Sequence, residues 1–161
     1  MRLQLSSTLL NQLRAHSEAA YPEEGAGFLL GRVEGDQRLL LSLLPAENTR
    51  EQGARHNRYL LGPEQMRCAE DIAQRLGLEL IGIFHSHPDH AAQPSEFDRE
   101  WALPWFSYLI TSVGKGQATD TQGWQLSEDR NQFIEIKILV EEDHVVNKSI
   151  SRLIDPETGD Y

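Results

Sequence analysis

The chain has 161 residues, of which 39% are hydrophobic and 25% charged, and both values are typical of one soluble globular domain. Its formal net charge is −10 and it has no run of basic residues, so the composition argues against a nucleic-acid partner. A single cysteine allows neither an internal disulfide nor a cysteine-rich zinc site, and no apolar stretch is long enough for a signal peptide or a membrane span. We therefore expect a cytoplasmic protein that does not enter a membrane.

The first half of the sequence predicts a strand, a helix and a hairpin. A short alternating stretch near the N-terminus indicates a strand, and the segment from Ser6 or Ser7 to Tyr21 predicts a helix with a serine as its N-cap. The apolar runs GAGFLLGRV and RLLLSLLP flank the turn-like EGDQ, a pattern typical of a β-hairpin. A polar loop over residues 46–58 follows.

The second half predicts two helices and four strands. The segment GPEQMRCAEDIAQRLG has proline near its start and glycine at its end, as helices often do. Its expected buried face consists of Met66, Ala69, Ala73 and Leu76. The strand LELIGIFHSH comes next, then a short helix from Ser95 and three further strands, FSYLITSV, TDTQGWQLS and FIEIKILV.

This order of elements predicts an α/β fold of the mixed α+β kind, with one sheet and helices packed against it. No interdomain linker or internal repeat interrupts the pattern. We therefore expect a single domain over residues 1–142, followed by a loosely ordered polar tail over residues 143–161.

The densest group of potential ligands lies in FHSHPDHAAQPSEFD, residues 84–98, directly after an apolar strand. Because alternate side chains of a strand point the same way, His85 and His87 should project together, with Ser86 on the other face. Two imidazoles at a strand end can clamp a metal ion, but they can equally be ordinary histidines near a turn. The pair alone leaves both interpretations open.

The end of the same segment adds a carboxylate. Ser95 and Asp98 have the spacing of a helix N-cap and its first turn, a feature of most helical proteins. The loop before Ser95 could also bring Asp98 back to the two imidazoles. Two histidines and one carboxylate are the ligand set of a hydrolytic zinc site, whose fourth position is left for water.

Hydrolysis at such a site also needs a general base, usually a carboxylate. Asp89 and Glu96 are candidates because they are near the histidines in sequence, and Glu23 and Glu24 are candidates from the strand opening PEEGAGFLLG. A solvated loop pair is the favoured interpretation of Glu23 and Glu24 from these residues alone, so they do not identify the base.

Seven positions together resemble the JAMM motif of the JAMM/MPN+ (Mov34/MPN/PAD-1) zinc metalloproteases. They are Glu24, His85, Ser86, His87, Pro88, Ser95 and Asp98. Seven residues separate His87 from Ser95, as in the family pattern, and the resemblance extends from about Pro22 to Phe133. Ala26 departs from the pattern, because many relatives have cysteine there.

The resemblance implies a single-domain MPN/JAMM fold, a curved mixed sheet flanked by helices. It also implies one Zn²⁺ ion, with His85, His87 and Asp98 as its ligands. Glu24 would be the catalytic residue that takes a proton from the metal-bound water, and Ser95 would help to stabilise the oxyanion.

The short chain and the segment HSHPDHAAQPS make the sequence most similar to compact bacterial members that act on small ubiquitin-like sulfur carrier proteins. This similarity implies a zinc-dependent peptidase or isopeptidase that hydrolyses the bond after the C-terminal Gly-Gly of such a carrier. His90 belongs to the same segment and could lie near the ligands or be solvated. The pathway stays open between cysteine biosynthesis, carrier maturation and antiviral conjugation, and so does the oligomeric state.

Other functions remain possible at this point. A non-catalytic MPN scaffold or interaction domain would share the fold, although such members typically lose the metal ligands. A RadC-like protein associated with DNA has a similar layout of histidines, serine and aspartate, but the acidic charge weighs against DNA binding. A metallohydrolase of small molecules would use the same ligands.

Two further groups have open interpretations. The only basic cluster consists of Arg50, Arg55 and Arg58 with His56. This cluster could bind a carboxylate of the carrier or form part of a solvated loop. Trp101, Trp105 and Phe106 are expected in the core or as a shelf for the metal loop rather than as a binding platform, although Trp105, which follows Pro104, could be exposed.

Overall fold

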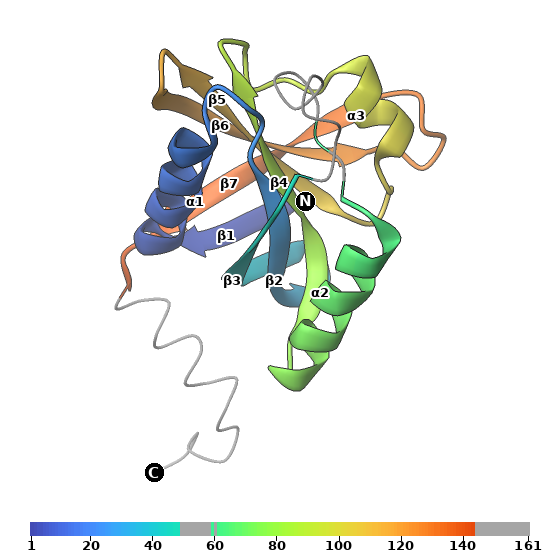
Figure 1. Ribbon diagram of the computed structural model, residues 1–161. Coiled ribbons are helices and arrows are strands. Elements are labelled where there is room, and N and C mark those ends of the chain that lie inside the picture. Colours follow the sequence, from blue (N-terminus) through green and yellow to red (C-terminus); the bar gives the residue numbers. More distant parts are fainter. Residues whose placement is uncertain (49–58, 60, 144–161) are drawn as a thin grey trace.

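The computed structural model describes residues 1–48, 59 and 61–143. These residues form seven strands and three helices, and the strands close into a barrel in the order β1-β3-β2-β4-β5-β6-β7 (Figure 1). The elements are β1 (Arg2–Ser6), α1 (Ser7–Ala20), β2 (Ala26–Glu34), β3 (Gln37–Ala46), α2 (Pro63–Arg75), β4 (Glu79–Pro88), α3 (Glu96–Trp101), β5 (Ser107–Gly114), β6 (Gln117–Leu126) and β7 (Phe133–Glu141). The predicted mixed α+β class is confirmed, and the sheet curves far enough to close on itself.

The barrel combines antiparallel hairpins with parallel strand pairs. β2 and β3 form the predicted hairpin, and Gly35 in its turn has a φ of 58°. β5 and β6 form a second hairpin, in which Lys115 and Gly116 have φ values of 50° and 82°, as both central residues of a type I′ turn require. β4 runs parallel to β5, and β1 closes the barrel by pairing in parallel with β3 and β7.

The strand that carries the two histidines is buried on both of its faces. Phe84 of β4 packs in a core with Leu13 of α1, whereas Ile83 packs in a second core with Ala69 and Ala73 of α2. Figure 1 shows these two helices on opposite sides of the sheet. Burial on both faces explains why this strand has a continuous apolar sequence instead of an alternating one.

The helix predictions are correct except at one buried position. Ser6 is the N-cap of α1, and its hydroxyl oxygen accepts a hydrogen bond of 3.1 Å from the Leu9 N–H. On α2, Leu76 was expected in the core but is 57% exposed. The reason is that α2 ends at Arg75, so Leu76 lies beyond the last full turn, and Ile72 contributes to the core in its place.

The described chain ends against the start of α1. The backbone N–H and the hydroxyl of Thr8 both donate to the carboxylate of Asp143. The remainder of the expected tail, residues 144–161, lies outside the described residues, so the domain boundary stays a prediction. The basic cluster within residues 50–58 also lies outside them.

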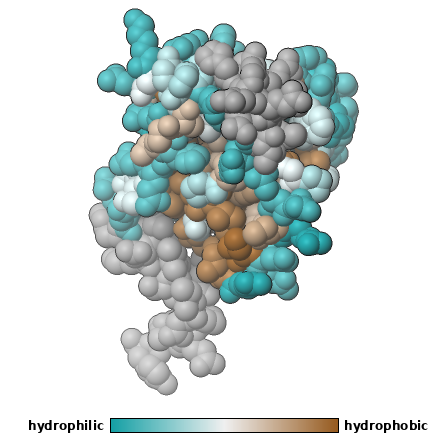
Figure 2. Space-filling model, viewed as in Figure 1, coloured by the Kyte–Doolittle hydropathy of each residue, from teal (hydrophilic) through white to brown (hydrophobic). Residues whose placement is uncertain are grey.

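The face of the molecule drawn in Figure 2 is mostly hydrophilic where its residues are described. Figure 2 shows one apolar area, over the part of the molecule where β2, β3 and α2 lie in Figure 1. β3 is half-buried over residues 41–44, which are mostly leucine. Among the described residues, the helices are all too short or too polar to span a membrane.

Gly27 of β2 occupies a position that has no room for a side chain. A Cβ atom there would lie 2.4 Å from Cε1 of Phe84 and 2.6 Å from the carbonyl oxygen of Leu44. We expect Gly27→Ala to lower the free energy of unfolding by about 1–3 kcal/mol, because the core would have to shift. Urea unfolding would measure this loss, with Gly114→Ala as the control, since the nearest atom to its Cβ is 3.9 Å away. Equal stability of the two variants would contradict the close approach.

Candidate metal centre

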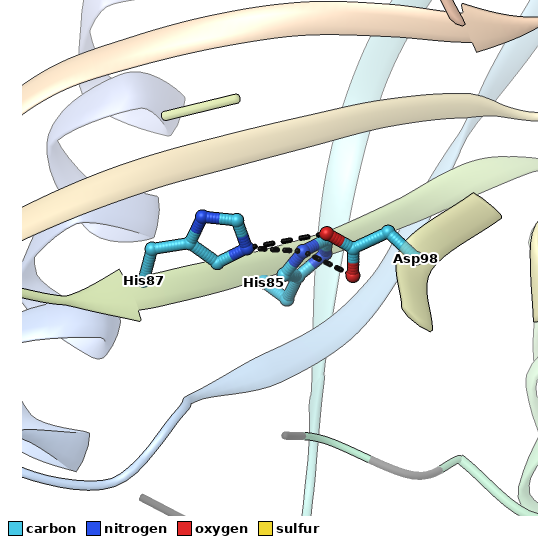
Figure 3. A group of neighbouring side chains, drawn as sticks. All are labelled: His85, His87 and Asp98. Carbon is cyan, nitrogen blue, oxygen red and sulfur yellow. Dashed lines mark hydrogen bonds and ion pairs between the residues drawn. The ribbon is translucent and has the colours of Figure 1, made fainter. Parts of the chain in front are cut away.

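Three side chains from two elements converge at one end of the barrel. His85 and His87 project together from the end of β4, and Asp98 lies in the first turn of α3 (Figure 3). The Nε2 atoms of the histidines are 3.2 Å apart, and carboxylate oxygens of Asp98 lie 3.1 Å from His85 Nε2 and 3.3 Å from His87 Nε2. All three residues are buried, with exposed fractions of 0%, 7% and 4%.

The short helix α3 is fixed at both of its ends. At its start, the Ser95 hydroxyl oxygen accepts a 3.1 Å hydrogen bond from the Asp98 N–H, and the Ser95 N–H donates to Asp98 Oδ2 at 2.7 Å. The predicted N-cap is therefore confirmed. At its end, the guanidinium of Arg130 donates to the carbonyl oxygens of Glu100 and Ala102. These bonds place the Asp98 carboxylate against the histidines.

The hydrogen bond of His87 favours metal binding through its Nε2. His87 Nδ1 lies 2.8 Å from the carbonyl oxygen of Ala91, so Nδ1 donates this bond and, in the neutral ring, the Nε2 lone pair faces the other two residues. His85 Nδ1 is buried and has no hydrogen-bond partner among the described residues. Its ring instead stacks on Tyr59, with centroids 4.3 Å apart and an angle of 25° between the planes.

The three groups shift one another's pKa. Burial raises the pKa of Asp98, but the charges and hydrogen bonds of His85 and His87 outweigh it and hold this pKa well below its usual range. Burial lowers the pKa of His85, and Asp98 offsets this only in part. Burial also acts to lower the pKa of His87, but Asp98 and Glu24 help to outweigh it, so this pKa is raised.

The arrangement fits a metal ion. Ligand atoms that lie about 2.0–2.1 Å from a tetrahedral zinc ion are about 3.3 Å from one another. The two Nε2 atoms are 3.2 Å apart, and their distances to Oδ1 and Oδ2 of Asp98, 3.1 and 3.3 Å, are also close to that value. One ligand atom from each residue lies within 4.8 Å of the other two, so His85, His87 and Asp98 could hold one ion.

Glu24 and Ser95 lie beside this group. Glu24 is buried, and with His87 and Ser95 it lines an open cavity of about 360 Å³. His90 and Gln93 line the same cavity. The structure thus brings together the five residues that the motif predicts, while the catalytic roles of Glu24 and Ser95 stay predictions.

The other candidate bases are engaged elsewhere. Asp89 accepts hydrogen bonds from the Tyr21 hydroxyl at 2.8 Å and from the Lys115 N–H at 2.9 Å. Glu96 forms an ion pair with Arg99 on the exposed side of α3. Among the acids considered from the sequence, Glu24 is therefore the one that lines the cavity beside the metal group.

One aromatic position differs from its prediction, and one was missed. Trp101, the last residue of α3, was expected in the core or as a shelf for the metal loop but is 59% exposed. Phe106 is buried as expected, and Trp105, for which exposure was left open, is 62% exposed. Tyr59, by contrast, is buried against His85 although it directly follows a polar loop, and no local pattern in the sequence signals this.

The fold and the ligand group together define a compact domain of the JAMM/MPN type. A model of the family of prokaryotic homologs of the JAB domain matches residues 6–127, so the chain belongs to this family. The resemblance seen in the sequence is thereby confirmed.

The similar proteins include a probable protease and a desampylase. A probable TtuB-protein conjugate cleaving protease of Thermus thermophilus is 33% identical over 108 residues, which are 65% of this chain and 68% of that protein. A desampylase of Haloferax volcanii is 29% identical over 136 residues, which are 83% of this chain and 90% of that protein.

Solved structures agree with the fold. The solution structure of a Desulfitobacterium hafniense protein matches with a TM-score of 0.76 and 28% identity, covering 88% of this chain and 94% of that one. A JAB1/MPN domain protein from Archaeoglobus fulgidus matches with a TM-score of 0.52 and 16% identity, covering 85% of this chain and 96% of that one. At this low identity the second match shows the fold alone.

Proposed function

We propose that the protein is a zinc-dependent peptidase or isopeptidase that hydrolyses the bond after the C-terminal Gly-Gly of a ubiquitin-like or sulfur carrier protein, in the cytoplasm. The observation that carries this proposal is the buried group of His85, His87 and Asp98, whose ligand atoms lie together, with His87 and Glu24 lining one open cavity. Similarity to proteins named as a TtuB-conjugate protease and a desampylase supports the substrate class.

His85, His87 and Asp98 would hold the zinc ion. When bound, zinc supplies a Lewis acid that polarises a carbonyl oxygen and makes a water molecule nucleophilic at neutral pH. Glu24 then accepts a proton from the attacking water, whose oxygen bonds to the carbonyl carbon. As the carbon–nitrogen bond breaks, Glu24 returns the proton to the leaving amine.

Ser95 would stabilise the charge that develops on the carbonyl oxygen. Its hydroxyl oxygen already accepts from the Asp98 N–H, which leaves the hydroxyl hydrogen for donation into the cavity. A preorganised donor of this kind acts mainly on the transition state.

Burial of the metal group supports a glycine-terminated substrate. Since the three ligands are at most 7% exposed, the scissile carbonyl must approach them closely, and side chains next to it would hinder that approach. Two successive glycines remove that obstacle. A DNA-associated role has less support, because the chain has a net charge of −10. A scaffold role would not require a complete and buried ligand group.

Hydrolysis of a defined carrier tests the proposal. The substrates are a small carrier protein that ends in Gly-Gly plus one extra residue, and the same carrier joined to a lysine side chain. We expect cleavage after Gly-Gly by the zinc-loaded protein, loss of cleavage after treatment with a chelator, and recovery when zinc is returned, all followed by mass spectrometry. A carrier ending in Ala-Ala plus one residue should not be cleaved. Stoichiometric zinc without cleavage of either substrate would contradict the proposed substrate.

A further inference from the structure

The peptide unit between Glu24 and Gly25 is held at both of its polar groups by side chains. The carbonyl oxygen of Glu24 accepts a hydrogen bond of 3.1 Å from Nδ2 of Asn48. The N–H of Gly25 donates to the hydroxyl oxygen of Ser86 at 2.8 Å, and the Ser86 N–H donates to the Gly25 carbonyl oxygen at 2.9 Å. All these groups are buried, so water does not replace a lost partner at low cost.

These bonds extend the sheet beyond the point where its backbone pairing stops. The β2–β3 ladder ends at the pair Ala26 and Ala46. Glu24 and Asn48 each lie two residues further, where the amide side chain takes over a bond that a backbone N–H would make within the ladder. On the other side of β2, Ser86 follows the last residue of β4 that pairs with this strand.

Asn48 is itself held in place. The side chain of Gln65, in the first turn of α2, donates to the carbonyl oxygen of Glu47 at 2.9 Å, and its oxygen accepts from the Gly62 N–H at 2.9 Å. Asn48 is only 9% exposed. The start of α2 thus holds Glu47, the residue next to Asn48.

We propose that Asn48 and Ser86 are positioning residues that orient the Glu24 carboxylate toward the metal group. Glu24 precedes β2, so its backbone direction depends on these two side chains. The inference rests on the proposed function, because a general base must be held within hydrogen-bond reach of the proton it takes. A misplacement of about 1 Å can cost about 10²-fold in rate.

Substitutions at Asn48 test this role. Asn48→Asp keeps the shape but removes the Nδ2 donor, and Asn48→Ala removes the side chain. We expect kcat to fall about 10²-fold in both variants, with KM and zinc affinity unchanged. Gln37→Ala is the matched control, because it removes an amide hydrogen bond to Gln4 at the far end of β3, and it should leave kcat unchanged. A parallel loss of zinc affinity in the Asn48 variants would overturn the proposal.

A double substitution shows whether Asn48 acts through Glu24. In the Glu24→Gln background, adding Asn48→Ala should cause no further loss of the residual rate, since the group being positioned is already inactive. Additive losses would mean that Asn48 acts on the reaction by another route and would overturn the proposal.

Amide hydrogen exchange tests the positioning independently of cleavage. In the zinc-loaded protein, we expect the Gly25 N–H to exchange faster in Ser86→Ala, which removes its acceptor, and in Asn48→Asp, which loosens the same peptide. If the wild type cleaves no carrier, the proposed function fails while faster exchange still supports the positioning. Unchanged Gly25 exchange in both folded variants would overturn the positioning even if the wild type is an active peptidase.

Discussion

Glu24→Gln is expected to remove most of the hydrolysis while leaving zinc in place. Glutamine has nearly the shape of glutamate but cannot accept the proton of the attacking water, and general-base catalysis contributes about 10²–10⁴-fold in rate. Because Glu24 is not one of the three converging ligands, stoichiometric zinc should remain. The measurements are kcat on the Gly-Gly carrier and zinc content by atomic spectroscopy.

Glu23→Gln is the matched control for this experiment. Glu23 is the neighbouring carboxylate, but it is half-exposed and does not line the cavity beside His87. The kcat of Glu23→Gln should therefore equal that of the wild type. The reverse result, an inactive Glu23 variant and an active Glu24 variant, would show that the base has been assigned to the wrong residue.

Asp98→Asn is expected to weaken zinc binding by at least about 10²-fold and to abolish hydrolysis with it. The amide is a poorer ligand than the carboxylate. Even the substitution of a residue that only hydrogen-bonds a ligand typically lowers metal affinity about 10–100-fold. Competition with a chromophoric chelator measures the affinity. Asp36→Asn, which changes an exposed carboxylate paired with the N-terminus, is the control and should bind zinc normally.

Asp98→Asn also has a defined effect on the stability of the metal-free protein. The pKa of Asp98 is lowered in the folded state, so its stabilisation is present above about pH 4 and is lost as the pH falls through the folded-state value. The pKa of His87 is raised, so its contribution is full below about pH 6.5 and is lost as the pH rises through the folded-state value. The stability difference between wild type and Asp98→Asn should therefore be largest between about pH 4 and 6.5. Urea unfolding measures this stability difference. If the difference were larger below about pH 4 or above about pH 6.5 than between them, the pairing of Asp98 with His87 would be contradicted.

The ligand positions could be predicted because their signals are local. Strand alternation places His85 and His87 on one face, and the spacing from Ser95 to Asp98 marks the start of a helix. The structure shows both features, since β4 extends to Pro88 and Ser95 caps α3. Glu24 was different, because it lies far upstream and only the family pattern connected it with the histidines.

The remainder depends on contacts between distant segments that no local pattern reveals. Asn48 reaches Glu24 from beyond the end of β3, and Tyr59 stacks on His85 from the end of a polar loop. Closure of the barrel was likewise invisible in the sequence, because it requires β1 and β7 to meet. A cluster of aromatic residues also does not reveal which ring faces the core.

The pairing of β1 with β7 affects how the protein matures on the ribosome. β1 is made first, and β7 is the last strand of the described chain to be made. His85, His87, Asp98 and Glu24 therefore emerge while one edge of β1 still has no neighbour, and exposed strand edges invite pairing with other chains. Contacts so distant in sequence also form slowly. The residues of the candidate metal centre thus leave the ribosome before the barrel that supports them can close.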